Sequence, residues 1–185
     1  MIASNNLRLR AAEPEDLELA YELENDTELW RLGSTNEPVS RFALKRFLEN
    51  NGGDIYADRQ VRLTIESRGE DGSWERVGFA DLFKFEPEHS RAEIGLALLP
   101  RFRGKHIGRN AVTLLADYAA LIGLHTIFAI ISEENKKASH TFERAGFVAS
   151  ARLCDWLWNG NSYVGANVWQ KIICHDHDRH RATRP

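Results

Sequence analysis

A basic, glycine-containing turn between a strand-like and a helix-like segment constrains the fold of this chain most strongly. Residues 92–99 have strand character and are closed by Pro100, and residues 110–124 carry apolar side chains at helical intervals. A short continuous apolar run follows at 126–131, as expected for a strand buried on both faces. This order predicts a strand, a crossover helix and a second strand.

The turn has the composition of an anion-binding site. Residues 101–109 contain four basic side chains and no acid. A glycine-containing loop that runs into a helix N-terminus presents backbone N–H groups without partners and the positive end of the helix dipole. A solvated basic turn is the alternative interpretation. No G-x-G-x-x-G or G-x-x-x-x-G-K-[ST] sequence is present, so dinucleotide and Walker-type phosphate loops fit poorly.

Further patterns predict strands and helices on both sides of this unit. Strands are predicted at 7–10, 61–67 and 76–85 and on both sides of Asn159-Gly160, a strong hairpin signal. Helices are predicted behind Pro14, behind the capping residue Ser40, and over 136–145, where Gly146 ends the helix.

Length and composition favour one domain. A chain of 185 residues with an apolar fraction of 43% can bury a core without metal or disulfide staples. We place this single domain at 1–173 and expect the polar tail, 174–185, to fray. The alternating His and Asp residues of the tail fit no closed zinc site, so no metal site is expected.

Charge and cysteine content exclude other classes. The 24 basic and 27 acidic residues give a net charge of −3, without the basic surplus of a general nucleic-acid binder. The apolar stretch 111–131 is interrupted by Asp117, Gly123 and His125, which predicts no membrane association. Two cysteines and no apolar signal segment behind the first residues predict a reducing, cytoplasmic setting.

Two segments resemble the coenzyme A-binding motifs of the GNAT acyltransferase superfamily. Residues 103–108, Arg-Gly-Lys-His-Ile-Gly, resemble the pyrophosphate loop R/Q-x-x-G-x-G/A of that family. Asn135-x-x-Ala138, with Phe142 and residues 145–147, is similar to its second acetyl-CoA segment. The order and spacing of the two segments match the family.

The resemblance extends across nearly the whole chain. Residues 8–10 and 158–163 are similar to the spermidine N-acetyltransferase and ribosomal-protein N-acetyltransferase branches. The family implies an α+β, GNAT-like acyl-CoA N-acyltransferase fold, with a mixed, mostly antiparallel sheet of about seven strands flanked by helices.

The family also implies acetyl-CoA as co-substrate and a place for it. Strand 93–98 would separate from strand 126–131, and coenzyme A would lie in the gap. Backbone groups of residues 97–99 would receive the pantetheine, and residues 103–109 the pyrophosphate. The cofactor-binding residues implied in this way are Ala97, Leu98, Leu99, Arg103, Gly104, Lys105, His106, Ile107, Gly108, Arg109, Asn135 and Phe142.

Three of these residues leave alternatives open. His106 replaces the middle glycine of the loop, which requires an unstrained φ and a ring turned from the phosphate; ring contact and plain exposure are both open. Asn135 either bonds pantetheine or caps the following helix. Phe142 replaces a tyrosine thought, in similar polyamine acetyltransferases, to protonate the leaving thiolate, and a phenyl ring has no proton to give.

Acetyl transfer to an amine needs a proton acceptor, a polarised carbonyl and a proton source for the thiolate. Glu93 is the predicted acceptor, because the resemblance places its strand beside the acyl group; a strand-surface glutamate is the alternative. A backbone N–H near Leu98 would polarise the carbonyl. Tyr163, Cys154, Ser139 or water could protonate the thiolate, and we name Tyr163 with Glu93 as the catalytic candidates.

The N-terminal region suggests a cationic acceptor. In this superfamily the N-terminal helices wall the acceptor cleft, so an acidic wall would attract a polyamine or a basic peptide; a solvated helix face is the alternative. The segment from Glu13 to Glu37 contains one basic residue, Arg31, and nine acids: Glu13, Glu15, Asp16, Glu18, Glu22, Glu24, Asp26, Glu28 and Glu37.

The resulting functional expectation is an N-acetyltransferase that moves an acetyl group from acetyl-CoA to a primary amine, such as the amine of spermidine. A protein N-terminal acetyltransferase and a non-catalytic acyl-CoA-binding module are the alternatives, the latter because of Phe142. Trp156, Trp158 and Trp169 suit either sheet packing or a subunit contact, which leaves a homo-oligomer open.

Overall fold

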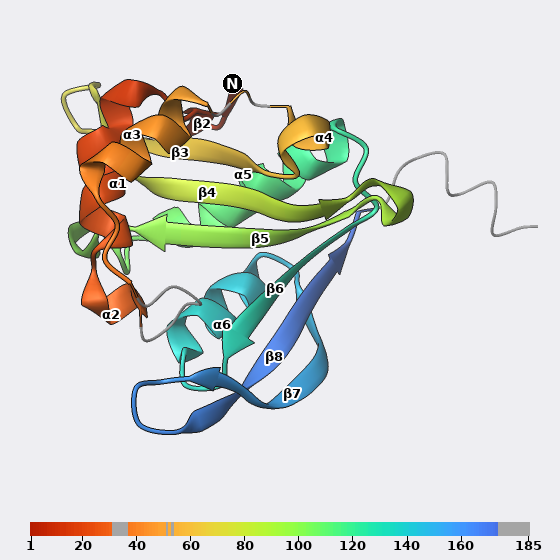
Figure 1. Ribbon diagram of the computed structural model, residues 1–185. Coiled ribbons are helices and arrows are strands. Elements are labelled where there is room, and N and C mark those ends of the chain that lie inside the picture. The colour runs from red at the N-terminus through yellow and green to blue at the C-terminus, as the bar shows by residue number, and fades with distance from the viewer. Residues whose placement is uncertain (31–36, 51, 53, 174–185) are drawn as a thin grey trace, which may run out of the picture.

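The computed structural model describes residues 1–30, 37–50, 52 and 54–173 (Figure 1). Arg31, Cys174 and the tail at 174–185 lie outside the described residues, so the fraying of the tail and the domain limits stay predictions. Within the described ranges, no helix has the length and apolar character needed to cross a membrane.

One eight-stranded sheet forms the framework, in the order β1-β2-β3-β4-β5-β6-β8-β7. All neighbouring strands are antiparallel except β5 and β6, which confirms a mixed, mostly antiparallel sheet. Sequence patterns missed only β1, which at two residues is too short to show alternation. The strands are β1 Ile2–Ala3, β2 Leu7–Ala11, β3 Val61–Arg68, β4 Trp74–Glu86, β5 Arg91–Leu98, β6 Thr126–Ser132, β7 Val148–Trp158 and β8 Tyr163–Ile172.

Helices lie on both faces of this sheet. The α-helices are α1 Leu17–Glu24, α2 Thr27–Trp30, α3 Arg41–Glu49, α4 Ile55–Asp58, α5 Ile107–Leu121 and α6 Lys136–Arg144. Short 3-10 turns are η1 Pro14–Asp16, η2 Pro87–His89 and η3 Pro100–Phe102. The predicted cap of α3 is confirmed, since Ser40 Oγ accepts the Ala43 N–H at 3.1 Å. Helix α5 begins at Ile107, three residues before the start predicted from the sequence. The apolar pattern did not show this first turn, because Gly108 and Arg109 interrupt it.

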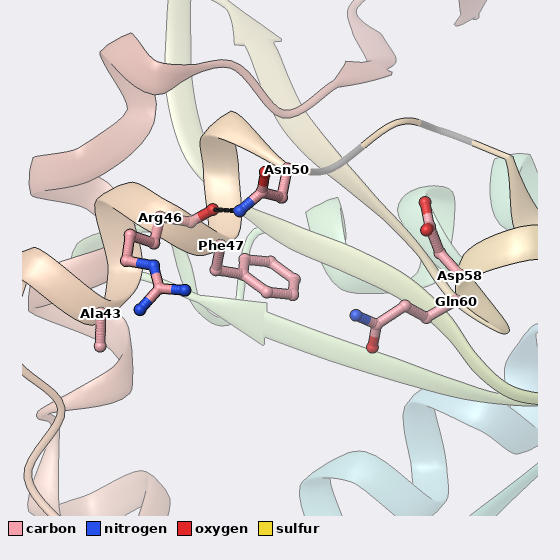
Figure 2. A pocket seen from close by; sticks show the side chains of 6 residues that line it. All are labelled: Ala43, Arg46, Phe47, Asn50, Asp58 and Gln60. Atoms are coloured by element: carbon pink, nitrogen blue, oxygen red, sulfur yellow. Dashed lines mark hydrogen bonds between the residues drawn. The ribbon is translucent and has the colours of Figure 1, made fainter.

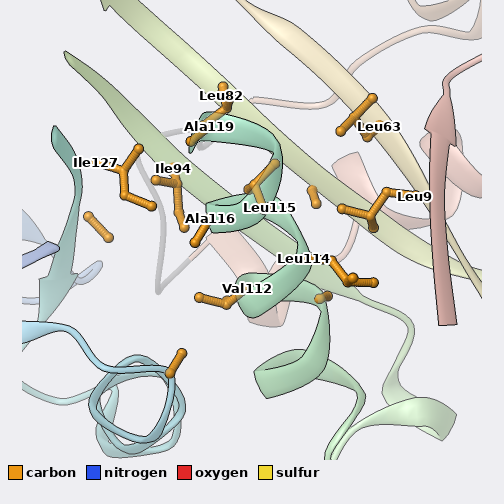
Figure 3. Packing of buried hydrophobic residues seen from close by; sticks show 14 of the residues in the cluster. Leu9, Leu63, Leu82, Ile94, Val112, Leu114, Leu115, Ala116, Ala119 and Ile127 are labelled. Atoms are coloured by element: carbon orange, nitrogen blue, oxygen red, sulfur yellow. The ribbon is translucent and has the colours of Figure 1, made fainter. Parts of the chain in front are cut away.

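Two apolar layers hold the helices to the sheet. Helix α5 packs on one face through Val112, Leu115 and Ala119, against Leu82 and Ile94 of the strands (Figure 3). Helices α1 and α3 cover the opposite face of β3 to β5 (Figure 1). The α1/α3 layer is built from Ala12, Leu19, Ala20, Leu23, Leu44, Leu48, Phe79 and Leu99.

Candidate active site

Strands β5 and β6 pair over only three residues and then separate. Residues 91–93 pair in parallel with residues 126–128. Beyond Glu93, β5 remains paired with β4 and β6 with β8. The two facing edges therefore open into a gap, and Figure 1 shows β6 diverging from β5. This confirms the predicted separation and places its vertex at Glu93.

The backbone of β5 presents only alternate residues to this gap. The Leu99 N–H donates to the Val77 carbonyl at 3.0 Å, so it faces β4. The Ala97 carbonyl also faces β4, because a Cβ at Gly78 would collide with it. The assignment of pantetheine contacts to the backbones of Ala97 and Leu99 is therefore corrected.

The polar groups of Leu96 and Leu98 face the gap, because successive residues of a strand direct their N–H and C=O groups to opposite sides. The Leu98 carbonyl already accepts a hydrogen bond from Arg103 Nε at 2.9 Å. The Leu98 N–H and both the N–H and the C=O of Leu96 therefore remain as the gap-facing groups without a hydrogen bond from Arg103. Leu96 was not expected to contact pantetheine, because the resemblance placed these contacts at residues 97–99, one residue further along the strand.

The N-terminus of α5 lies at the open end of the gap. A Cβ at Gly108 would meet Leu96 Cδ2 at 3.3 Å, Thr141 Cγ2 at 3.5 Å and Leu98 Cδ1 at 3.6 Å. Gly108 therefore lies in close contact with β5 and α6, and a larger residue there would require the Leu96 side chain to move slightly. The N–H groups of Ile107, Gly108 and Arg109 belong to the first helical turn and have no intrahelical acceptor.

The loop before α5 is built on left-handed backbone. Gly104 has φ +77° and His106 has φ +61°. The requirement of an unstrained φ at His106 is not met, since L-residues other than glycine rarely adopt this conformation. The His106 side chain is exposed and does not cap the helix.

The basic side chains of the loop divide into two kinds. The Arg103 guanidinium forms hydrogen bonds within the protein: it donates to the Leu98 carbonyl and to Asp26 Oδ2, the latter at 3.1 Å. Arg103 thus joins the loop to the segment after α1, and its contact with phosphate stays a prediction. Lys105 and Arg109 are exposed, and Arg109 forms no ion pair within the described part of the chain.

Glu93 lies at the vertex of the gap on the face covered by α1 and α3. Its neighbours Ala92 and Ile94 belong to the α5 layer, so its own side chain points to the other face. The side chain is only 10% exposed, and Glu93 Oε2 lies 2.8 Å from Lys84 Nζ. The alternative of a strand-surface glutamate is wrong, because the carboxylate is buried and paired.

Tyr163, one of the proton-donor candidates, is not brought to this vertex. Across the sheet, Gln170 of β8 lies opposite Phe128, the partner of Glu93, whereas Tyr163 lies seven residues away at the start of β8. At about 3.3 Å per residue this places Tyr163 roughly 20 Å along the strand. Its exposed ring instead contacts Trp158, with centroids 5.2 Å apart. Within one chain, this separation argues against Tyr163 as the proton donor to a thiolate held near Glu93.

Helix α6 places Asn135, Ser139 and Phe142 at successive turns of one face. Asn135 Oδ1 accepts the Ala138 N–H at 3.0 Å, so of its two open roles the structure has the cap. Phe142 is buried, and its ring packs edge-on against Phe147 with centroids 5.0 Å apart. Ser139 is half-buried one turn before Phe142, whereas Cys154 is exposed on β7.

The acidic N-terminal segment is largely neutralised by arginines of the same chain. Among the described residues, five of its nine acids form ion pairs: Asp16 with Arg10 (2.7 Å), Glu18 with Arg41 (2.9 Å), Glu22 with Arg101 (3.5 Å), Glu24 with Arg62 (2.7 Å) and Asp26 with Arg103 (3.1 Å). The expectation of a free acidic wall is thus corrected.

A pocket on the α1/α3 face is lined in part by residues that pair with the strand of Glu93. Its volume is about 260 Å³, and its lining is Phe47, Gln60, Val61, Arg62, Asp81, Leu82 and Phe83. Asp81 and Phe83 pair in register with Gly95 and Glu93. Arg62 Nε and Nη2 donate to Asp81 at 2.9 and 3.1 Å. Asp81, a charged residue within the otherwise apolar stretch 77–83, was the sequence signal for this site, whereas Arg62 is one of several polar residues in an alternating strand.

A second pocket of about 410 Å³ shares Phe47 and Gln60 with the first. Figure 2 shows its lining side chains between α3 on one side and the segment after α4 on the other. The lining consists of Ala43, Arg46, Phe47, Asn50, Asp58 and Gln60. The two pockets share this wall, and we refer to them together as the recess.

These features define an acyltransferase architecture: a parallel strand pair that opens beside an anion-binding helix N-terminus, with a buried carboxylate at the vertex. The profile of the acetyltransferase (GNAT) domain matches residues 6–148. The chain belongs to this family, so the reaction is acetyl transfer and acetyl-CoA is the co-substrate.

Curated relatives and solved structures agree with this membership. The chain is 26% identical over 167 residues to spermidine N(1)-acetyltransferase of Escherichia coli K12, covering 90% of this chain and 86% of the relative. It is 27% identical over 161 residues to the Vibrio cholerae enzyme of that name, covering 86% and 89%.

Two structures share the fold. Spermidine N-acetyltransferase from Vibrio cholerae, in complex with CoA and spermine, has a TM-score of 0.78 at 24% identity, covering 91% of this chain and 96% of that one. The microcin C7 self-immunity acetyltransferase MccE, in complex with acetyl-CoA and AMP, has a TM-score of 0.75 at 21% identity, covering 92% and 94%.

Proposed function

We propose that this enzyme acetylates a primary amine of a polyamine such as spermidine. The observation that carries the proposal is the buried Glu93 carboxylate at the point where β5 and β6 separate. An alkyl ammonium has to lose a proton before it can attack a thioester, and a carboxylate at this vertex accepts that proton directly or through water. The acetyl group would lie beside it in the gap.

Coenzyme A would be held by backbone more than by side chains. The gap-facing groups of Leu96 and Leu98 suit the pantetheine amides, and the N–H groups from Gly104 to Arg109 suit the pyrophosphate. A gap-facing backbone N–H of β5 nearer Glu93 than Leu98 would polarise the thioester carbonyl, because Leu98 lies five residues, roughly 16 Å, along the strand from Glu93. Lys105 and Arg109 add positive charge at the phosphates.

The recess, made of two adjoining pockets, suits an extended cationic acceptor. Three carboxylates, Glu24, Asp81 and Glu93, share two cations, Arg62 and Lys84, which leaves one net negative charge near the vertex. The aromatic rings of the recess suit the methylene segments of a polyamine. Relatives with 26% and 27% identity carry the name spermidine N(1)-acetyltransferase.

An amine panel tests this acceptor class. Thiol release from acetyl-CoA is measured with spermidine, spermine, a short monoamine, basic peptides and aminoglycosides. We expect the polyamines to give the highest kcat/KM and the monoamine a raised KM, because it fills only the end of the recess. A preference for peptide N-termini would contradict the polyamine proposal, and binding without acceptor-dependent release would favour the non-catalytic module.

Replacing Arg109 with Ala is expected to weaken coenzyme A binding about tenfold, because one charge-assisted phosphate contact is lost. Binding of pantetheine, which has no pyrophosphate, should not change. The remaining affinity for coenzyme A should also depend less on salt. Calorimetric titration of both ligands at two ionic strengths measures these differences. An equal loss for both ligands would contradict the phosphate assignment.

Replacing Phe142 with Tyr is expected to raise kcat with little change in coenzyme A affinity. The new hydroxyl can donate a hydrogen bond to the departing thiolate, and a positioned general acid contributes about 10²–10⁴-fold. Coenzyme A thiolate is a good leaving group, so we expect a gain at or below the bottom of that range. Steady-state kinetics at saturating acetyl-CoA measure the gain, and a melting curve shows whether the hydroxyl disturbs the core. Unchanged turnover in a folded variant would mean that thiolate protonation does not limit the rate.

We further propose a homo-oligomer that uses the β7–β8 hairpin. Strand β7 is the edge of the sheet, and Val148, Trp156, Trp158 and Tyr163 are exposed on the hairpin. A Vibrio cholerae spermidine N-acetyltransferase of this fold is described as dodecameric. Light scattering of the wild type and of Trp158→Ser tests this assembly, which a monomeric wild type would contradict.

A further inference from the structure

An amine of this chain already lies at the proton-accepting carboxylate. Lys84 Nζ is 2.8 Å from Glu93 Oε2, the oxygen to which an acceptor ammonium would donate. Lys84 is a primary alkyl amine on a flexible stem, chemically equivalent to one end of a polyamine. Its side chain is 66% exposed, whereas that of Glu93 is 10% exposed, so the lysine reaches inward from the cleft edge.

The local backbone aims Lys84 at this position. The β4–β5 ladder is irregular between Phe83 and Glu86, and Lys84 lies within the irregularity at φ +50°. A regular strand would direct the side chains at 83 and 84 to opposite faces. The left-handed residue instead brings Lys84 to the same side as Glu93, where its ammonium also lies 5.5 Å from the Phe83 ring centre.

We propose that Lys84 is a site of self-acetylation. The inference rests on the proposed role of Glu93. Glu93 takes one proton from the Lys84 ammonium, and the neutral Nζ attacks the carbonyl carbon of the acetyl thioester. The N–C bond forms as the C–S bond breaks, coenzyme A leaves as a thiolate, and the second proton lost from Nζ neutralises that thiolate. The products are Nε-acetyl-Lys84 and free coenzyme A, and no oxidant or further reactant is required.

The modification would change the cleft that it faces. Acetylation removes the charge of Lys84, so Glu93 loses its ion-pair partner and the net negative charge near the vertex increases by one. Free acceptor and Lys84 compete for the same carboxylate oxygen. A saturating acceptor should therefore protect Lys84 from acetylation.

The test compares Lys84 with a matched lysine that does not line the recess. Lys45 is 59% exposed and is paired with Glu49 at 3.7 Å on α3, so it reports non-enzymatic acetylation of an exposed, ion-paired lysine. The full chain is incubated with acetyl-CoA without acceptor, and acetylation at both positions is followed by peptide mass spectrometry. We expect the initial rate at Lys84 to exceed that at Lys45 by at least about tenfold, given the size of general-base effects.

Two variants distinguish acetylation of Lys84 that depends on Glu93 from the intrinsic reactivity of an exposed lysine. Glu93→Gln should lower acetylation at Lys84 to the level of Lys45 and leave Lys45 unchanged. Lys84→Arg keeps the ion pair and should abolish the modified peptide. Equal rates at the two lysines in the wild type overturn the proposal without any variant. If an amine of the panel gives thiol release while Lys84 stays unmodified, self-acetylation is wrong and the proposed function stands; if neither occurs, both fail.

Discussion

Glu93→Gln is expected to lower kcat/KM for the amine acceptor by about 10²–10⁴-fold near neutral pH, the usual contribution of a positioned general base. Gln has nearly the same shape as Glu and can still hydrogen bond Lys84, so the vertex keeps its packing. It cannot accept the ammonium proton. The loss should shrink at high pH, where more of the acceptor amine is already neutral.

Profiles of kcat/KM against pH for wild type and variant measure this effect. Glu86→Gln is the matched control: Glu86 lies on the same hairpin and pairs with Arg91 at 2.8 Å, but it is exposed. The control should retain wild-type kinetics. A decrease for Glu93→Gln that is uniform across pH would indicate a role in positioning the acceptor and would contradict the base assignment.

Local sequence order was sufficient to predict the backbone of the coenzyme A site. Strand β5, the basic turn, α5 and β6 are contiguous in the chain, so periodicity and turn residues predict them. The caps at Ser40 and Asn135 were predictable for the same reason, since each involves residues three positions apart. The vertex at Glu93 depended on the family resemblance, because periodicity does not show where a ladder ends.

Side-chain partners remote in sequence were not predictable. Arg103 is 77 residues from Asp26, so the basic loop and the acidic segment were interpreted separately, although each neutralises part of the other. Arg62 and Glu24 are 38 residues apart and were missed for the same reason. Tyr163 was misplaced because the resemblance indicates a strand but not how far along it the residue lies. The sequence shows that His106 replaces a glycine of the loop, but only the structure shows that the backbone at this residue is left-handed.

Through Asp16, the acidic segment stabilises the fold in addition to carrying negative charge. Its side chain is fully buried and accepts hydrogen bonds from Arg10 Nη1 at 2.7 Å, Arg10 Nη2 at 2.8 Å and Thr64 Oγ1 at 2.7 Å. It also accepts the Glu13 N–H at 3.0 Å at the start of η1. Asp16 therefore fixes the beginning of the helix whose end carries Glu24 and leads to Asp26, the partners of the cleft and of the loop.

Asp16→Ala is expected to destabilise the protein by about 3 kcal/mol, the lower end for breaking a buried ion pair, because Arg10 keeps partial contact with water. Urea denaturation at pH 7 measures the change. Glu18→Ala is the control: Glu18 pairs with Arg41 at the surface, and its removal should change the unfolding midpoint little. Equal effects of the two substitutions would contradict the structural role of Asp16.

The pH dependence of this difference provides a second, independent readout. Burial alone would raise the pKa of Asp16, but hydrogen bonds from Arg10, the Glu13 N–H and Thr64 lower the pKa from 3.8 to about 2. A carboxyl with a lowered pKa stabilises the fold above the pKa of the unfolded chain and loses that contribution as the folded form is protonated. The ionised carboxylate should thus contribute roughly 2 kcal/mol above pH 4, decreasing to nothing below pH 2. The stability difference between wild type and Asp16→Ala should narrow across that window, and a difference independent of pH would show that the lost contacts act through packing and not through charge.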